Sequence, residues 1–145
     1  MQGLSKYIRR CRGYFSSKLP SYLVFFVTAR CNLNCRMCFY WEHIQKATQE
    51  NELTLGEIER ISKSFGQILN LAISGGEPFL RDDLAEVCHI FYKNNHVSFI
   101  NIPTNGSLPE RIEAITDKIL RLCKMATVVI ELSIDDIGAA HDYIR

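Results

Sequence analysis

The strongest constraint on the fold of this chain is an alternation of strand-like and helix-like segments along most of its length. Runs of β-branched and aromatic residues are typical of buried strands, and segments with apolar residues at every third or fourth position are typical of helices. Strands are expected at residues 22–28, 70–74, 97–102 and 127–134, and helices at about 54–65, 84–91 and 110–122. This order predicts an α/β fold of parallel strands joined by crossover helices, either a doubly wound sheet or part of a (β/α) barrel.

Helix boundaries carry local signals. Thr54 and Glu57 have the spacing of a capping box, and Ser107 and Glu110 repeat it before the third helix. Asp83 is expected to start the second helix.

Residues 135–145 read as a loop that enters another helix, after which the sequence ends. Because an uncovered parallel strand at a sheet edge is unfavourable, we expect a truncated form of a larger protein, the alternative being a complete four-stranded domain. We divide the chain into a basic segment, 1–19, and a partial core domain, 20–145.

Charge is distributed unevenly, although the net charge is only +1. No acidic residue precedes Glu42, whereas the preceding segment carries several lysines and arginines. A solvated leading helix is the favoured interpretation, so no nucleic-acid partner is expected. No apolar run is long enough to cross a bilayer and no secretory signal is visible, which predicts a cytoplasmic protein without a transmembrane segment.

Three of the six cysteines, Cys31, Cys35 and Cys38, lie within eight residues after the first expected strand. Clustered cysteines outside a secreted disulfide framework indicate metal or redox chemistry. Three thiolates leave one iron of a four-iron cluster open for a non-protein ligand. Zinc is the rival, with His43 as a fourth ligand. Cys88 and Cys123 lie on apolar helical faces and are expected to be buried structural thiols.

Polar groups also follow the other three expected strands, where parallel β/α folds bind ligands. Residues 75–78 read Gly-Gly-Glu-Pro, and 103–106 read Pro-Thr-Asn-Gly. Glu131, Ser133 and Asp135 alternate, so we expect them to share a face. The segments after the second and third strands could be only tight turns, and Ser133 and Asp135 could be only helix caps. However, the segments after all four strands are expected to meet at one rim, the edge of the sheet where the carboxyl ends of the strands lie.

These motifs resemble the radical SAM superfamily, whose members cleave S-adenosylmethionine (SAM). The resemblance rests on C-x3-C-x2-C at 31–38, Gly-Gly-Glu-Pro at 75–78 and Ser-Ile-Asp at 133–135, and covers about residues 20–145. It implies a partial (β/α) barrel with about four parallel strands. It also implies that Cys31, Cys35 and Cys38 ligate a [4Fe–4S] cluster whose fourth iron is chelated by SAM.

The resemblance further implies roles for individual residues. Gly75, Gly76, Glu77 and Pro78 would orient the SAM amino group, while Ser133 and Asp135 would serve the ribose or carboxylate region. Met37 stands where the family often has an aromatic residue against adenine, and Asn105 is a further candidate for cofactor binding.

The implied reaction is reductive cleavage of SAM to a 5′-deoxyadenosyl radical that abstracts hydrogen from a substrate. The implied partners are a peptide or small-molecule substrate and a one-electron reductant such as flavodoxin or ferredoxin. Peptide modification and cofactor or sugar biosynthesis are the expected settings. The molybdenum-cofactor cyclase branch normally has an arginine where this chain has Ala72, which argues against that branch. The alternative function is a zinc- or iron–sulfur-stabilised binding module without catalysis.

Overall fold

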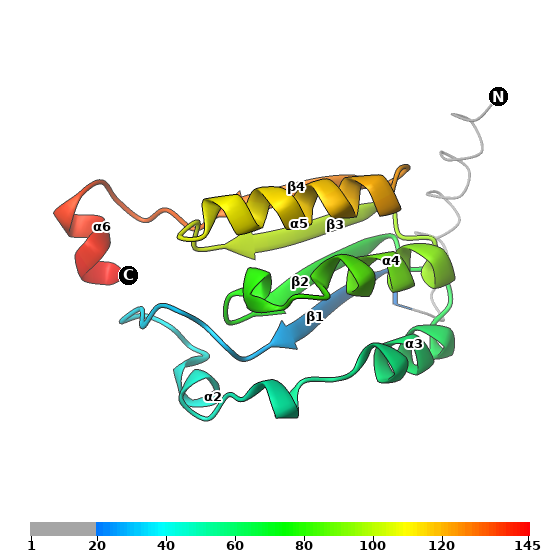
Figure 1. The fold of residues 1–145 in the computed structure, drawn as a ribbon, viewed down its shortest axis with the longest axis horizontal. Helices are drawn as coiled ribbons and strands as arrows, with labels where there is room; N and C mark the ends of the chain where they lie inside the picture. Colours follow the sequence, from blue (N-terminus) through cyan, green and yellow to red (C-terminus); the bar gives the residue numbers. More distant parts are fainter. Residues whose placement is uncertain (1–19) are drawn as a thin grey trace.

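The computed structural model describes residues 20–145, so the basic segment 1–19 lies outside the described residues. Four strands alternate with helices in the predicted order (Figure 1). The strands are β1 (Tyr22–Thr28), β2 (Asn70–Gly75), β3 (Phe99–Thr104) and β4 (Thr127–Leu132). The α-helices are α2 (Trp41–Gln45), α3 (Leu55–Ser64), α4 (Leu84–Asn95), α5 (Pro109–Leu122) and α6 (Ala139–Ile144), and two 3-10 turns are η1 (Gln49–Asn51) and η2 (Pro78–Leu80).

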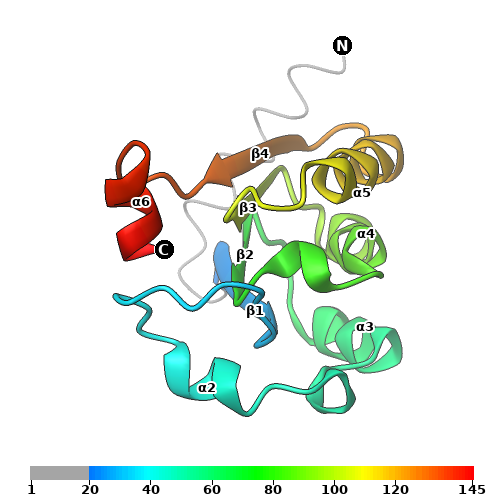
Figure 2. The same cartoon turned by 60° about the vertical axis from the view of Figure 1, so that its left-hand side comes forward.

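All neighbouring strands are parallel and follow one another in the order β1-β2-β3-β4. Helices α3, α4 and α5 lie side by side on one face of the sheet, as Figures 1 and 2 show. A doubly wound sheet reverses its strand order and carries helices on both faces. The sequential order with helices on one face is instead the winding of a (β/α) barrel.

The core lies between the sheet and these three helices. Alternate residues of the central strands, such as Leu71, Ile73, Ile100 and Ile102, point toward the helices and are 0–2% exposed. Their helix partners are Ile58, Leu84, Phe91 and Ile119, each fully buried. Burial of this apolar face holds the strands in register and thereby fixes where their carboxyl ends meet.

The first strand differs from the prediction that it is buried throughout. Tyr22, Val24 and Phe26 are 53%, 51% and 42% exposed, while Leu23 and Phe25 pack against the core. The reason is that β1 lies at the sheet edge and the helices cover only one of its faces. An uninterrupted apolar run therefore concealed an alternation of buried and open positions.

Helix starts follow the predictions in two of three cases. The capping box is present at α3: the Thr54 backbone N–H donates to Glu57 Oε2 at 2.9 Å, and Glu57 N–H donates to Thr54 Oγ1 at 3.3 Å. At α4, Asp83 occupies the N-cap without a side-chain bond, because its carboxylate pairs with Arg81 at 2.5 Å. The third helix begins at Pro109, and its N-cap is Leu108 rather than Ser107.

Within residues 20–145, no helix is both long enough and apolar enough to span a membrane.

Candidate metal and cofactor site

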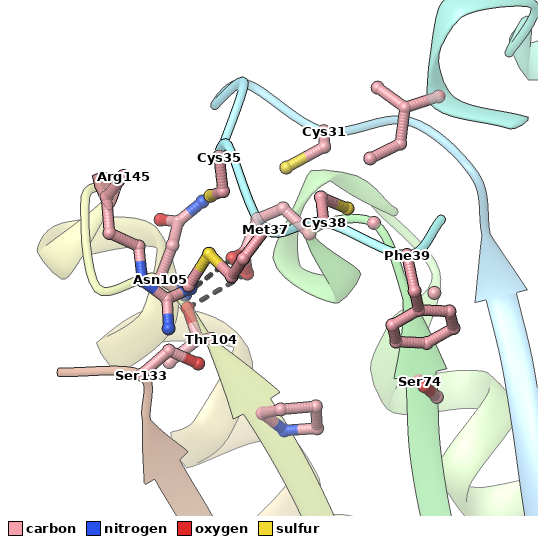
Figure 3. A pocket seen from close by; sticks show the side chains of 15 residues that line it. Cys31, Cys35, Met37, Cys38, Phe39, Ser74, Thr104, Asn105, Ser133 and Arg145 are labelled. Atoms are coloured by element: carbon pink, nitrogen blue, oxygen red, sulfur yellow. Dashed lines mark hydrogen bonds between the residues drawn. The ribbon is translucent and has the colours of Figure 1, made fainter. Parts of the chain in front are cut away.

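A cavity of 310 Å³ opens at the carboxyl ends of the strands. It is lined by the loop after β1 and by the ends of all three other strands (Figure 3). The lining residues are Cys31, Cys35, Met37, Cys38, Phe39, Ile44, Ser74, Gly75, Gly76, Glu77, Pro103, Thr104, Asn105, Ser133 and Arg145. The structure thus brings together segments that lie up to about a hundred residues apart in the sequence, as parallel β/α topology requires.

The three clustered cysteines all face this cavity and are half-buried. Their loop turns through a bond from the Cys38 N–H to the Cys35 carbonyl at 3.1 Å, and the Arg36 N–H donates to the Ile144 carbonyl of α6 at 3.0 Å. Figure 3 shows the thiols on the loop above the strand ends. The thiols are therefore presented to one space from one short segment.

Burial raises the pKa of the Cys31 thiol, and the nearby charges of Glu77, Cys35 and Cys38 raise it further. The Leu33 N–H, which donates to the Cys31 sulfur at 3.5 Å, opposes this shift. A bound cation would relieve the mutual repulsion of the thiolates, because metal ligation stabilises the deprotonated form.

Gly75 and Gly76 let two backbone segments touch. A Cβ at Gly75 would lie 2.0 Å from the Thr28 carbonyl oxygen, and one at Gly76 would lie 2.1 Å from that of Arg30. Gly75 also has a φ of +122°, which glycine adopts without strain. The Gly76 N–H donates to the Thr28 carbonyl at 2.9 Å, and the Glu77 N–H donates to the Arg30 carbonyl at 2.8 Å. These glycines therefore seat the start of the cysteine loop against the end of β2, in addition to lining the cavity.

Glu77 is 1% exposed, and its carboxylate is held by three donors. Oε1 accepts from the Thr104 hydroxyl at 2.9 Å and from the Phe79 N–H at 3.2 Å, and Oε2 accepts from the Asn105 N–H at 2.8 Å. The side chain thus ties η2 to the end of β3. Pro78, the first residue of η2, is buried and lies outside the cavity lining.

Asn105 lines the cavity and links two of its loops. Its Nδ2 donates to Asn32 Oδ1 at 2.9 Å, and its Oδ1 accepts from the Ser107 N–H at 2.9 Å. Asn32 in turn donates to the Ser107 hydroxyl at 2.7 Å. This exposed triangle joins the cysteine loop to the loop after β3.

The end of β4 contributes Ser133 to the cavity but neither Glu131 nor Asp135. Instead, Asp135 pairs with Arg145 at 2.6 Å. Arg145 and Cys35 both line the cavity. Asp135 therefore reaches the site through Arg145, a cavity residue that the sequence analysis missed because no motif marks it.

Two further arginines, Arg30 and Arg81, hold the end of β1 against neighbouring loops. Arg30 donates to Glu52 Oε1 at 2.6 Å and to the Leu80 carbonyl at 3.2 Å. Arg81 is 3% exposed and donates to the Val27 carbonyl at 2.9 Å. Both side chains fasten the end of β1 to neighbouring loops, a role that only tertiary contacts reveal.

The donor set fits an iron–sulfur cluster better than a zinc ion. A cubane places each cysteine on a different iron, so its thiolates stand farther apart than the ligands of one ion. Among the described residues, no three His, Cys, Asp or Glu side chains converge on a single-ion position. The imidazole of His43 stacks on Tyr40, with ring centroids 4.6 Å apart, and is exposed.

Comparison with known proteins identifies the class. The model of the radical SAM superfamily matches residues 25–144. A probable GTP 3′,8-cyclase from Methanococcus aeolicus is 39% identical over 88 residues, which is 59% of this chain and 29% of that protein. Molybdenum cofactor biosynthesis protein 1 from Dictyostelium discoideum is 31% identical over 121 residues, which is 82% of this chain and 18% of that protein.

Solved structures show the same fold. SuiB of Streptococcus suis, bound to its precursor peptide SuiA, superposes with a TM-score of 0.63 at 19% identity, covering 99% of this chain and 31% of that one. SuiB bound to SAM superposes with a TM-score of 0.59 at 18% identity, over 99% of this chain and 32% of that one.

The fold and site define a β/α protein with a cysteine-lined cavity at its strand ends. This chain belongs to the radical SAM superfamily, a family of enzymes that use a [4Fe–4S] cluster and SAM. The predicted family, fold class and cofactors are thereby confirmed. The chain spans less than a third of the length of the two curated relatives described above.

Proposed function

We propose that the protein containing this chain cleaves SAM reductively, with Cys31, Cys35 and Cys38 holding a [4Fe–4S] cluster. The observation that carries the proposal is the single cavity shared by these thiols and by the ends of β2, β3 and β4. When bound, the reduced cluster supplies one electron that breaks a C–S bond of SAM, giving methionine and a 5′-deoxyadenosyl radical that takes a hydrogen atom from substrate.

The chain's own residues bind and orient SAM in this proposal. The Gly75 and Gly76 carbonyls would accept from its ammonium group, and Ser133 would donate to its ribose or carboxylate. Met37, 51% exposed in the cavity wall, would pack on adenine through its thioether. Glu77 and Asn105 would hold the loops in place through the contacts described above, and Pro78 would support the turn.

Arg145 would bind the SAM carboxylate. It contributes the one guanidinium of the described cavity wall, which has no lysine, and the carboxylate is the one anionic group of SAM. Asp135 would position it through their ion pair.

The finer assignments are part of the same proposal. The substrate would be a peptide or a small molecule, and flavodoxin or ferredoxin would supply the electron, in the cytoplasm. The cyclase similarity alone does not favour GTP, because position 72, where that branch is expected to have arginine, is alanine.

Anaerobic reconstitution with iron and sulfide, followed by EPR of the reduced protein with and without SAM, tests the proposal. The protein should be made from its complete reading frame. We expect a [4Fe–4S]+ signal that changes when SAM is added, and formation of 5′-deoxyadenosine. Separate Cys→Ala substitutions at 31, 35 and 38 should abolish the signal, whereas Cys11→Ala should retain it. Colourless protein with equimolar zinc would instead establish the binding-module alternative.

A further inference from the structure

The sheet has an open face opposite its three packed helices. Along β4, Val128 and Ile130 pack against the core, so Val129 and Glu131 point to the other side. Parallel register extends this open face across the sheet, because paired residues point the same way. Its residues are Tyr22, Val24 and Phe26 of β1, Asn70, Ala72 and Ser74 of β2, Phe99, Asn101 and Pro103 of β3, and Thr127, Val129 and Glu131 of β4.

The open face is continuous with the cavity. Ser74 and Pro103 belong to both, and Pro103 is paired directly with Glu131 in the β3–β4 register. Ser133, two residues beyond Glu131, lines the cavity as well. A substrate placed beside bound SAM would therefore extend onto this face.

Charge on the open face is one-sided. Its twelve positions include no lysine or arginine, and Glu131 is their single carboxylate. The Glu131 side chain is exposed, and its carboxylate makes no hydrogen bond or ion pair within residues 20–145. Three other carboxylates near the site are already paired: Glu77 with three donors, Asp135 with Arg145 and Glu52 with Arg30.

Hydrogen-atom abstraction moves a neutral atom, so this carboxylate is not required by the proposed chemistry. An unpaired carboxylate on a substrate-facing surface attracts a cation and repels an anion. Around it the face is uncharged, with Val24, Ala72, Asn101 and Val129 in one paired row.

We propose that Glu131 binds a cationic group of the substrate, an ammonium or guanidinium carried by an otherwise uncharged molecule. This inference rests on the proposed function and specifies its substrate class. It disfavours a phosphorylated substrate, because the phosphate would meet Glu131 and find no cation on the face. Amine-bearing small molecules and basic side chains of peptides share the required chemistry.

The test is a ligand-observed NMR titration of the anaerobic holoprotein with matched probes. Phenethylamine is compared with neutral 2-phenylethanol, and acetyl-Leu-Lys-Leu-amide with its norleucine analogue. We expect each cationic probe that fits the site to bind more tightly than its neutral match. Glu131→Gln should weaken the binding of that cationic probe about fivefold, as expected for the loss of one exposed charge pair. If the effect appears with the phenethylamine pair, the cationic group belongs to a small molecule. If it appears with the peptide pair, the group is a basic side chain of a peptide.

Two further variants complete the design. Glu110→Gln removes an exposed carboxylate from α5, on the helix-covered side of the sheet, and should leave all four affinities unchanged. Glu131→Lys should reverse the preference toward a phosphorylated peptide. Equal binding of cationic and neutral probes to the wild-type protein, or equal effects of Glu131→Gln on both, would overturn the inference. The EPR response to SAM reports separately on the proposed function.

Discussion

Gly76 supports the site by leaving space for another part of the backbone. Substitution by alanine would place a Cβ 2.1 Å from the Arg30 carbonyl oxygen, so the β2 loop and the cysteine loop must separate. We expect Gly76→Ala to lower the free energy of unfolding by about 2–3 kcal/mol and to impair cluster assembly. Denaturant unfolding and iron content after reconstitution measure the two effects.

Gly56 provides the matched control, since a Cβ there meets nothing within 4 Å and the residue lies inside α3. Gly56→Ala should raise stability by about 0.5–1 kcal/mol, because alanine favours the helix. Equal effects of both substitutions would contradict the steric explanation.

Glu77 is buried with three donors directed at its two carboxylate oxygens. Glu77→Gln replaces one acceptor by an NH₂ group that faces a donor, so we expect a loss of about 1–3 kcal/mol in the free energy of unfolding. Glu113→Gln, on the exposed side of α5, should change it by less than about 0.5 kcal/mol. If Glu77→Gln lowered SAM affinity without changing stability, Glu77 would act on the ligand directly rather than through the loops.

Cysteine reactivity should separate the site thiols from the core thiols. Burial raises the pKa of Cys123 to about 11, and burial together with the nearby Cys123 raises that of Cys88 as well. Both remain protonated at pH 8, and only the thiolate is alkylated. In the cluster-free protein, iodoacetamide should therefore modify the half-buried cavity thiols of Cys31, Cys35 and Cys38 before those of Cys88 and Cys123.

Peptide mass spectrometry over time follows each site, and raising the pH toward 11 should accelerate the reaction of Cys123. Denatured protein supplies the control, because all cysteines should then react at similar rates. Rapid labelling of Cys88 in the folded protein would show that its surroundings open readily.

At the scale of elements, one helix end is strained. His96 ends α4 with φ of 55° and ψ of 40°, a left-handed conformation that glycine adopts at lower cost. Its side chain is exposed, so His96→Gly should raise the free energy of unfolding by about 1 kcal/mol. Lys93→Gly, inside the same helix, should lower it by a similar amount. Thermal or denaturant unfolding of both variants provides the comparison. If His96→Gly did not stabilise the protein, conformational strain at His96 would be ruled out.

Periodicity predicted the main strands and helices because each buries one apolar face, which leaves a regular pattern. Local competition decided the boundaries that the pattern could not predict. Asp83 is the N-cap of α4 as predicted, but its carboxylate pairs with Arg81 rather than with the helix. Ser107 bonds Asn105, and Leu108 is the N-cap of α5. Helix α2, only Trp41–Gln45, is too short to show a period and was not predicted.

At the scale of the whole molecule, the cysteines, the glycines and Ser133 could be assigned to one rim from sequence, because parallel topology gathers strand ends. Arg145 could not, since its place depends on how α6 docks: Arg36 lies over the Tyr143 ring, with 3.8 Å between the guanidinium carbon and the ring centroid. Nor could the sequence reveal that the glycines contact the β1 end. Such contacts arise from packing between distant segments rather than from any local pattern.

The arrangement of the sheet also predicts how stability is distributed. Strands β2 and β3 each pair with described strands on both sides and carry the most deeply buried residues, whereas β1 and β4 pair on one side. Backbone amides exchange through openings whose free energy follows this local packing. We therefore expect the amides of Leu71, Ile73, Ile100 and Ile102 to exchange most slowly, and those of β1 and β4 measurably faster. Hydrogen exchange followed by mass spectrometry or NMR measures this order. Equal protection of β4 would contradict this distribution of stability.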